Sequence, residues 1–370
     1  MTPDTPLPVF DFADRPDYSD FTRAAGTGRR QPLAGFDDDY TDIVDYIVRC
    51  THKIWEEKAI GLIYTHYAHN ALVHTTGGII YGRETVVRNT IQNQAMWGDL
   101  RAYADDVIWS GDDRLGYYTS HRHSNTATQS GYTEFGPPTG RKIAYWGIAD
   151  CFIVHNRIVE EWLTHDGVTV IRQMGYDPVA LARQAVLPAT PHTHGEIDRL
   201  PTGQQAPEFL DVPDGTRDPQ GFVRAVLLNL WNARLVNMVR EHHAPGHVAF
   251  VPDSRKLVGY GDYENFVITF MACFPDLAIT VDHQCVQGDA ERGHRVATRC
   301  TLQGTHEGHG PYGAPTGRRI FLIVISHHIV QDGKITQEWT VFDEFALLKQ
   351  LYGQPGGRGD AQATSADLVP

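Results

Sequence analysis

The sequence predicts an α+β protein built from two similar domains in tandem. Two segments, residues 139–175 and 316–353, share a Thr-Gly-Arg motif, a strand-like stretch and a Trp-x-x-x-Asp motif. Matched positions lie a constant 177 residues apart, so that Asp166 in the first copy corresponds to Asp343 in the second. A spacing this long is a whole fold, since solenoid repeats span about 20 to 50 residues. Helical segments precede long strands in each copy, which is an α+β order.

Composition divides the chain into five parts. Each copy is long enough to bury a core of its own. The stretches outside the copies are rich in Pro, Gly and Asp and lack hydrophobic periodicity, which is typical of linkers and disordered segments. We therefore expect an extended N-terminal arm over residues 1–36, a first domain over 37–178, a linker over 179–220, a second domain over 221–353 and a disordered tail over 354–370.

The first domain begins with helices. Apolar residues recur at three- and four-residue spacing from Ile43 to Ile54, and a second helical piece follows over residues 58–69. A short hairpin around Gly77 and Gly78 and a helix over residues 83–97 come next. Turn residues then separate four long strands, over residues 100–109, 116–131, 141–156 and 157–166. We expect these strands to form a curved antiparallel sheet that wraps over the helices as a cone, with a pocket at its open end.

The second domain repeats this order. A helical segment over residues 222–243 is followed by a short strand over 247–252 and a helix over 263–274. Strands then run from Leu277 to Phe342. The recurrence of the same order predicts the same fold in both copies.

Charge and cysteine content restrict the function classes. Lys plus Arg number 32 against 45 for Asp plus Glu, a net charge of −13, which argues against a nucleic-acid or anionic-membrane partner. No apolar run approaches the roughly 18 residues of a membrane helix, and the N-terminus lacks a signal-peptide pattern. The five cysteines form no C-x-x-C pair, so we expect buried thiols in a reducing compartment, the cytoplasm.

Several ordered motifs in the second copy carry a family resemblance. They read FPDLAITVDHQ, GTHEG, APTGRR, DGKITQEWTVFD and LLKQLYG, and the first copy keeps PPTGRK, RIVEEWLTHD and QMG. This pattern resembles the SnoaL-like polyketide cyclases, or ester cyclases, of the nuclear transport factor 2-like superfamily (NTF2-like). The first copy departs from it at Gln129, where the second has His306. The resemblance implies two cone-shaped α+β barrels with mostly apolar pockets, paired within the chain as a pseudo-dimer that can associate further.

The resemblance also implies a catalytic position. Cyclases of this family use an Asp after the Trp motif as general acid/base, without a metal or an organic cofactor. That position is Asp166 in the first copy and Asp343 in the second. An Asp beside Trp162 inside a cone would be partly desolvated, which raises its pKa toward neutrality. The alternative is that Asp166 caps the turn at Gly167.

Histidines of the first copy are further candidates. His121 and His123 are two residues apart on an expected strand, so they share a face with Tyr117. Histidine titrates near pH 6.5 and can relay protons or stabilise negative charge. The second copy has Thr298 and Cys300 at these two positions, which favours the first copy as the active one. We expect catalytic roles for Asp166, His121, His123, Tyr117 and His165, substrate contacts from Trp162, His74, His66, His69 and Tyr103, and a second pocket with Asp343, Trp339, His306 and His327.

The sequence therefore predicts an acid/base enzyme of the lyase, cyclase or isomerase type. Its substrate would be an oxygenated aromatic or polyketide-like small molecule bound in the first domain, with no cofactor. One alternative is a binding or scaffold protein without catalysis. Another is a metal-dependent lyase or hydrolase in which the His-Arg-His pair binds an ion together with His74 or Asp166.

Overall fold

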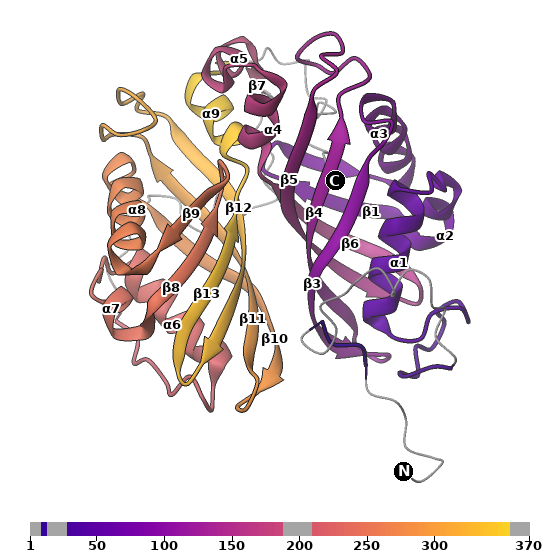
Figure 1. Ribbon diagram of the computed structural model, residues 1–370, viewed down its shortest axis with the longest axis horizontal. Coiled ribbons are helices and arrows are strands. Elements are labelled where there is room, and N and C mark those ends of the chain that lie inside the picture. The colour runs from indigo at the N-terminus through magenta and orange to yellow at the C-terminus, as the bar shows by residue number, and fades with distance from the viewer. Residues whose placement is uncertain (1–8, 13–27, 188–208, 356–370) are drawn as a thin grey trace. The chain divides into compact units, whose positions relative to one another are not determined.

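The computed structural model describes residues 9–12, 28–187 and 209–355 (Figure 1). Contacts between these residues divide the chain into two units. The first unit extends to Leu163 but excludes Thr76–Gly78. The second unit contains Thr76–Gly78 and the described chain from Thr164 onward. Most of the predicted arm and tail and half of the predicted linker lie outside the described residues. The domain boundaries and the pseudo-dimer stay predictions. The first part of the predicted linker is helical, since α5 spans Pro178–Gln184.

The first sheet has six strands in the order β2-β1-β6-β5-β4-β3. The long strands fall where alternation of apolar and polar residues predicts them, and α1, α2 and α3 gather on one side of the sheet (Figure 1). The elements are α1 (Ile43–Trp55), the 3₁₀ turn η2 (Ile60–Leu62), α2 (Ile63–His66), β1 (Tyr67–Thr75), β2 (Gly78–Tyr81), α3 (Arg83–Met96), β3 (Arg101–Asp112), β4 (Gly116–Thr128), β5 (Lys142–Val154) and β6 (Arg157–His165).

The second sheet has the order β10-β11-β12-β13-β8-β9, which is the order of the first sheet read from its other edge. Helices α6, α7 and α8 accompany it as α1 to α3 accompany the first sheet (Figure 1). The remaining elements are α4 (Gly167–Met174), α5, β7 (Val186–Leu187), α6 (Pro219–Trp231), α7 (Met238–His242), β8 (His243–Val251), β9 (Arg255–Val258), α8 (Gly259–Cys273), β10 (Ala278–Asp289), β11 (Gly293–Thr305), β12 (Arg319–Gln331), β13 (Lys334–Val341), α9 (Glu344–Tyr352) and β14 (Gln354–Pro355).

The predicted antiparallel sheets are mixed, which corrects the sequence prediction. β1 pairs with β6 and β8 pairs with β13 in parallel, whereas β3, β4 and β5 pair antiparallel. A parallel pair needs a long connection between its strands. Here a hairpin strand, a helix and three long strands separate β1 from β6, so the two can align in one direction. Alternation along one strand contains no information about the direction of its neighbour.

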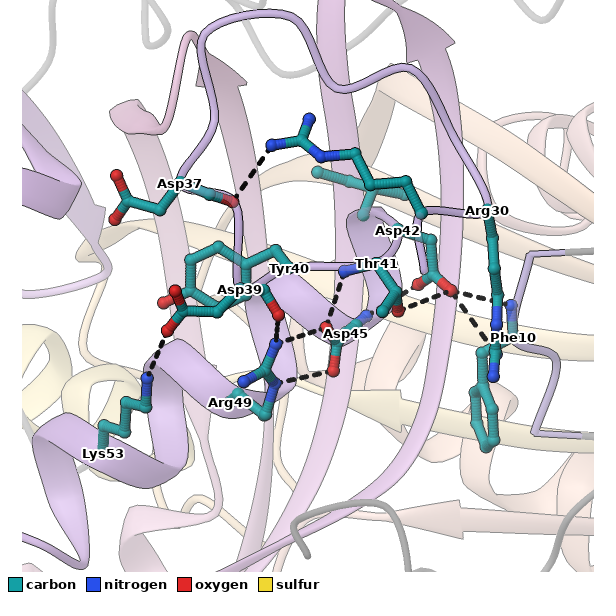
Figure 2. A network of polar contacts seen from close by, with 12 residues as sticks. Phe10, Arg30, Asp37, Asp39, Tyr40, Thr41, Asp42, Asp45, Arg49 and Lys53 are labelled. Atoms are coloured by element: carbon teal, nitrogen blue, oxygen red, sulfur yellow. Dashed lines mark hydrogen bonds and ion pairs between the residues drawn. The ribbon is translucent and has the colours of Figure 1, made fainter. Parts of the chain in front are cut away.

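Buried contacts fix the N-terminal segment on α1 (Figure 2). Asp42 is the N-cap of α1, and its fully buried carboxylate accepts hydrogen bonds from Asp45 N at 2.8 Å and Phe10 N at 3.2 Å. Arg30 lies 3.6 Å from the same carboxylate. One turn further on, Arg49 forms an ion pair with Asp45 at 2.6 Å. Capping bonds of this kind satisfy backbone donors that the first helical turn leaves open, and they tie residues 9–12 to the first unit.

Two composition-based predictions have structural counterparts. All five cysteines are buried free thiols. None of the helices in the described part of the chain is long and apolar enough to cross a lipid bilayer.

Candidate active site

The first unit holds a partly open cavity of about 70 Å³. Its lining residues come from helices α1, α2 and α3 and from strands β1, β3, β4, β5 and β6. Most of the wall is apolar, as in ligand sites whose specificity comes from a few polar groups. The polar side chains on the lining are Thr51, Tyr67, Thr90, His121, His123, Asn125 and Glu161, and the cysteines are Cys50 and Cys151.

Glu161 is the carboxylate of this cavity. Neighbouring side chains of a strand point to opposite faces, so β6 directs Glu161 inward while Trp162 points away. The hydroxyl of Tyr67 donates a hydrogen bond to Oε2 of Glu161 at 2.9 Å. Burial raises the pKa of Glu161 to about 7, although the bond from Tyr67 acts in the opposite direction. A carboxyl group that titrates near neutral pH can both accept and return a proton.

Two imidazoles share the cavity with this carboxylate. His121 and His123 lie on β4, are 3% and 5% exposed, and have ring centroids 5.5 Å apart. Their common face is the one that strand alternation predicts. The side-chain amide of Asn125, the next inward residue, lies 2.8 Å from Nδ1 of His123. This contact holds the ring of His123 in place.

The structure places Asp166 elsewhere. Its carboxylate is the N-cap of α4 and accepts from Thr169 N at 3.3 Å and Thr169 Oγ1 at 2.6 Å. It also accepts from the backbone N–H groups of Asp253 at 2.9 Å and Ser254 at 3.0 Å, in the β8–β9 turn. Asp166 belongs to the second unit and does not line the cavity of the first. These four donors occupy both carboxylate oxygens of Asp166. This arrangement is the one expected if Asp166 acts as a helix cap, and its catalytic role stays a prediction.

Tyr117 and His165, two other catalytic candidates, also lie away from the cavity lining. The Tyr117 hydroxyl donates to Asp113 Oδ1 at 2.8 Å, and its ring packs against Phe36 in a hydrophobic cluster. Burial raises the pKa of Tyr117. His165 is buried in the second unit.

The predicted substrate-contact residues occupy other parts of the first unit. His74 and Trp162 stack with ring centroids 5.1 Å apart, and His74 Nε2 lies 2.7 Å from Glu160, on the face of the sheet opposite Glu161. His66 bonds to the Tyr40 hydroxyl at 2.7 Å. The remaining two, His69 and Tyr103, are exposed.

The metal alternative has no matching geometry. Among the described residues, the His-Arg-His pair forms no group of metal ligands with His74 or Asp166.

The cavity of the second unit differs in chemistry. It measures about 40 Å³, and its lining is apolar apart from Ser326 and Cys300. The predicted second-pocket residues do not line it. Asp343 caps α9 by accepting from Ala346 N at 2.9 Å, Trp339 stacks on Phe250 at 5.5 Å, His306 lies 3.2 Å from Thr316 Oγ1, and His327 is buried.

Sequence reasoning missed Glu161, Tyr67 and Asn125. One signal could have found Glu161. Both copies place a Glu directly before the repeated Trp, at Glu161 and Glu338, and these residues are again 177 positions apart. Since Trp162 faces away from the helices, the residue before it must face the interior. A charged residue at an interior position of both copies is a functional-site candidate.

Comparison with known proteins supports the family resemblance for the second domain. Residues 222–351 match the model of the family described as SnoaL-like polyketide cyclase. None of the curated proteins compared with the chain matches it. A protein from Jannaschia sp. CCS1 described as a SnoaL-like polyketide cyclase is 19% identical, with 35% of this chain and 91% of that chain covered and a TM-score of 0.32.

Two further solved structures are similar over about one domain. TsrD from Streptomyces laurentii is 17% identical, with 36% of this chain and 94% of that chain covered and a TM-score of 0.32. IdmH from Streptomyces antibioticus is 27% identical, with 35% of this chain and 96% of that chain covered and a TM-score of 0.30. The family match thus concerns the second domain, and the sheet of the first domain has the same strand order.

Proposed function

We propose that the first domain is a cofactor-independent acid/base enzyme of the lyase, cyclase or isomerase type, with Glu161 as its base. The substrate class is an oxygenated aromatic or polyketide-like small molecule. The observation that carries the proposal is a half-buried carboxylate with a pKa of about 7, facing a mostly apolar cavity that also holds two imidazoles. Perturbed acids in a cavity are typical of catalytic sites.

The chemistry begins with a C–H bond next to a carbonyl group. The Glu161 carboxylate removes that proton, and the electron pair of the C–H bond becomes the C=C bond of an enolate. The enolate carbon then attacks a second carbonyl carbon of the same molecule, which closes a ring, or it takes the proton at another position, which isomerises the substrate. In the ring closure, the new alkoxide recovers the proton from Glu161, so the enzyme returns to its initial state.

His121 and His123 stabilise the developing negative charge in this scheme. An N–H group of either ring can donate to the enolate oxygen, and such donors act strongly in a site from which water is excluded. Tyr67 is a positioning residue, because its hydrogen bond holds the Glu161 carboxylate and tunes its pKa. The SnoaL-like match lies in residues 222–351 of the second domain, and the first domain, whose sheet has the same strand order, is the one that carries the acid/base groups of this reaction class.

Proton wash-in tests the proposal before the natural substrate is known. In D₂O, wild-type protein should exchange the acidic C–H protons of an aromatic β-keto compound faster than buffer does, as followed by NMR. Glu161→Gln should lower this rate by about 100-fold or more, since general-base catalysis contributes roughly 10² to 10⁴. Glu160→Gln, on the opposite face of β6, is the matched control and should retain the rate. A fully active Glu161→Gln protein would contradict the proposal.

A binding role is the second candidate, and it fits the second domain. Its cavity is apolar, with Thr298 and Cys300 where the first domain has the two imidazoles. An apolar lining without an acid or base can hold a ligand but cannot move its protons. A Glu161→Gln protein that still binds the ligand but no longer exchanges its protons would show that binding does not need Glu161. Catalysis would then belong to the first domain alone.

A further inference from the structure

We propose that the second domain binds a divalent transition-metal ion of the zinc class through His243, His247 and Glu338. The nearest ligand atoms of these three side chains lie within 4.8 Å of one another, and all three are buried. Two imidazoles and a carboxylate are a donor set that suits zinc and its neighbours in the first transition row. The site is separate from the cavities of both units.

The fold brings the ligands together through an irregularity in β8. This strand pairs in parallel with β13, and the register shifts between Ile335↔His243 and Gln337↔Val248. Between these two pairs the chain advances five residues along β8 but only two along β13. Residues 244–247 therefore have no regular partners in β13. A regular strand would send side chains four residues apart to the same face but about 13 Å from each other. The shift instead brings the rings of His243 and His247 to a centroid distance of 4.7 Å.

The polar atoms of the cluster lack the partners that burial normally demands. Within the described residues, Nδ1 of His243, both ring nitrogens of His247 and Oε2 of Glu338 have no hydrogen-bond partner. The exposed fractions of these residues are 2%, 1% and 2%. Each unsatisfied buried polar atom costs about 1 to 3 kcal/mol. A cation bound among them would satisfy several of these atoms at once.

The separations suit an ion better than a hydrogen bond. His247 Nε2 lies 3.8 Å from Oε2 of Glu338, beyond hydrogen-bond reach. Ligands about 2.0 to 2.1 Å from a tetrahedral zinc ion are roughly 3.4 Å apart. His328 pairs with Glu338 between β12 and β13, and its Nε2 also lies 3.8 Å from that oxygen.

The charges around the cluster favour a cation. The ion-pair contacts of Glu338 within the described chain are to imidazoles, with no Lys or Arg among them. Tyr263 interacts with Glu338 and packs on both β8 rings, which closes the cluster to solvent. Buried protein ligands without contact to solvent are typical of structural zinc sites.

The first domain lacks this cluster, which provides an internal control. Its equivalent carboxylate is Glu161, but Tyr67 and Ala71 replace the two β8 histidines and Cys151 replaces His328. Tyr67 satisfies Glu161 with a hydrogen bond instead. The metal ligands are therefore specific to the second domain.

Metal analysis of the full chain, purified without a histidine tag, tests the site. Titration calorimetry should show that the metal-free protein binds one equivalent of zinc tightly. The zinc-bound protein should also have a higher melting temperature than the metal-free protein. His247→Asn and Glu338→Gln should each raise the Kd for zinc at least 100-fold, while Glu161→Gln should leave it unchanged. Circular dichroism must show that the variants are folded.

Cobalt(II) substitution gives a second readout, because visible absorption distinguishes four- from six-coordinate cobalt. Intense bands that disappear in His247→Asn would support a four-coordinate site at this cluster. Wild-type protein that binds no zinc, or folded His247→Asn and Glu338→Gln variants that bind it as tightly as wild type, would overturn the proposal. Neither outcome would affect the Glu161 proposal, whose readout is proton exchange.

Discussion

At the residue scale, Glu161 should make stability depend on pH. The folded protein holds its proton up to about pH 7, whereas the unfolded chain releases it near the ordinary value of 4.5. The unfolded state therefore binds fewer protons between these values, and stability should fall as pH rises from 4.5 through 7. Glu161→Gln removes this dependence. The free energy of unfolding of the variant minus that of wild type should increase by a few kcal/mol between pH 4.5 and 8.

Urea titrations at a series of pH values measure this difference. Glu160→Gln, which alters a partly exposed carboxylate, is the control and should show a much smaller change. If the difference between wild type and Glu161→Gln were independent of pH, Glu161 would have an ordinary pKa in the folded protein and could not act as a neutral-pH base.

Tyr67→Phe should raise the pKa of Glu161 above about 7. The Tyr67 hydroxyl stabilises the charged carboxylate through a 2.9 Å hydrogen bond. Hydrogen bonds to charged groups contribute about 1.5 to 3 kcal/mol, which corresponds to roughly 1 to 2 pKa units. An NMR titration of the ¹³C-labelled carboxyl group measures the shift directly. The pH at which proton exchange reaches half its maximum should move upward by the same amount, and an unchanged titration would show that Tyr67 does not tune the base.

The sequence identified part of the candidate site. Alternation on a strand predicts that His121 and His123 share a face, and the structure puts both in one cavity. The sequence prediction names Asp166, the last residue of the repeated Trp-x-x-x-Asp motif, and leaves out Glu161, which directly precedes Trp162. Sequence spacing does not show that β6 ends at His165, so that Asp166 starts a helix and its oxygens meet backbone donors from the β8–β9 turn. That partner is 87 residues away in the chain.

At the element scale, Asp166 should contribute to stability through α4 and the β8–β9 turn. Asp253 and Ser254 of that turn have φ of 64° and 53°, a left-handed conformation that is costly for non-glycine residues. Their N–H groups donate to Asp166, so the carboxylate supports the helix end and the strained turn together. Asp166→Ala should lower the free energy of unfolding by about 2 kcal/mol or slightly more, at the upper end of N-cap losses.

Chemical denaturation measures this loss, and Asp177→Ala is the matched control. Asp177 is exposed and caps α5 by accepting from Val179 N and Ala180 N of its own helix, so its loss should be below about 1 kcal/mol. Asp166→Ala should also leave the pH at half-maximal proton exchange unchanged. A stable Asp166→Ala protein without exchange activity would return Asp166 to the role of catalytic acid/base.

The strands themselves were largely predictable, whereas their partners were not. The predicted strands over residues 116–131 and 141–156 correspond to β4 (Gly116–Thr128) and β5 (Lys142–Val154). Local alternation and turn residues determine where such strands lie. The parallel contact of β1 with β6 depends on a long-range choice between sheet edges, which no local pattern encodes. That pairing matters for the site, because it places Val73 of β1 beside Glu161 of β6 and Tyr67 of β1 beside Ile158 of β6.

At the scale of the whole molecule, two sheets with one strand order have different interiors. The first sheet presents His121, His123 and Glu161 to a cavity, whereas the second has Thr298 and Cys300 at the equivalent β-strand positions. The second instead gathers histidines around Glu338. A shared carboxylate is thus associated with two proposed uses, proton transfer in the first domain and metal binding in the second. Backbone order sets the position of the carboxylate, and its neighbours determine its chemistry.

This difference predicts that zinc and Glu161 act on separate unfolding transitions. Each unit has its own sheet and helices, so calorimetry of the full chain should resolve two transitions. Zinc should raise only the transition of the second unit, since a ligand at 100 times its Kd stabilises the folded state by about 2.7 kcal/mol. Glu161→Gln should move only the other transition, and Glu338→Gln should abolish the zinc effect. A single transition that responds to both changes would show instead that the units unfold together.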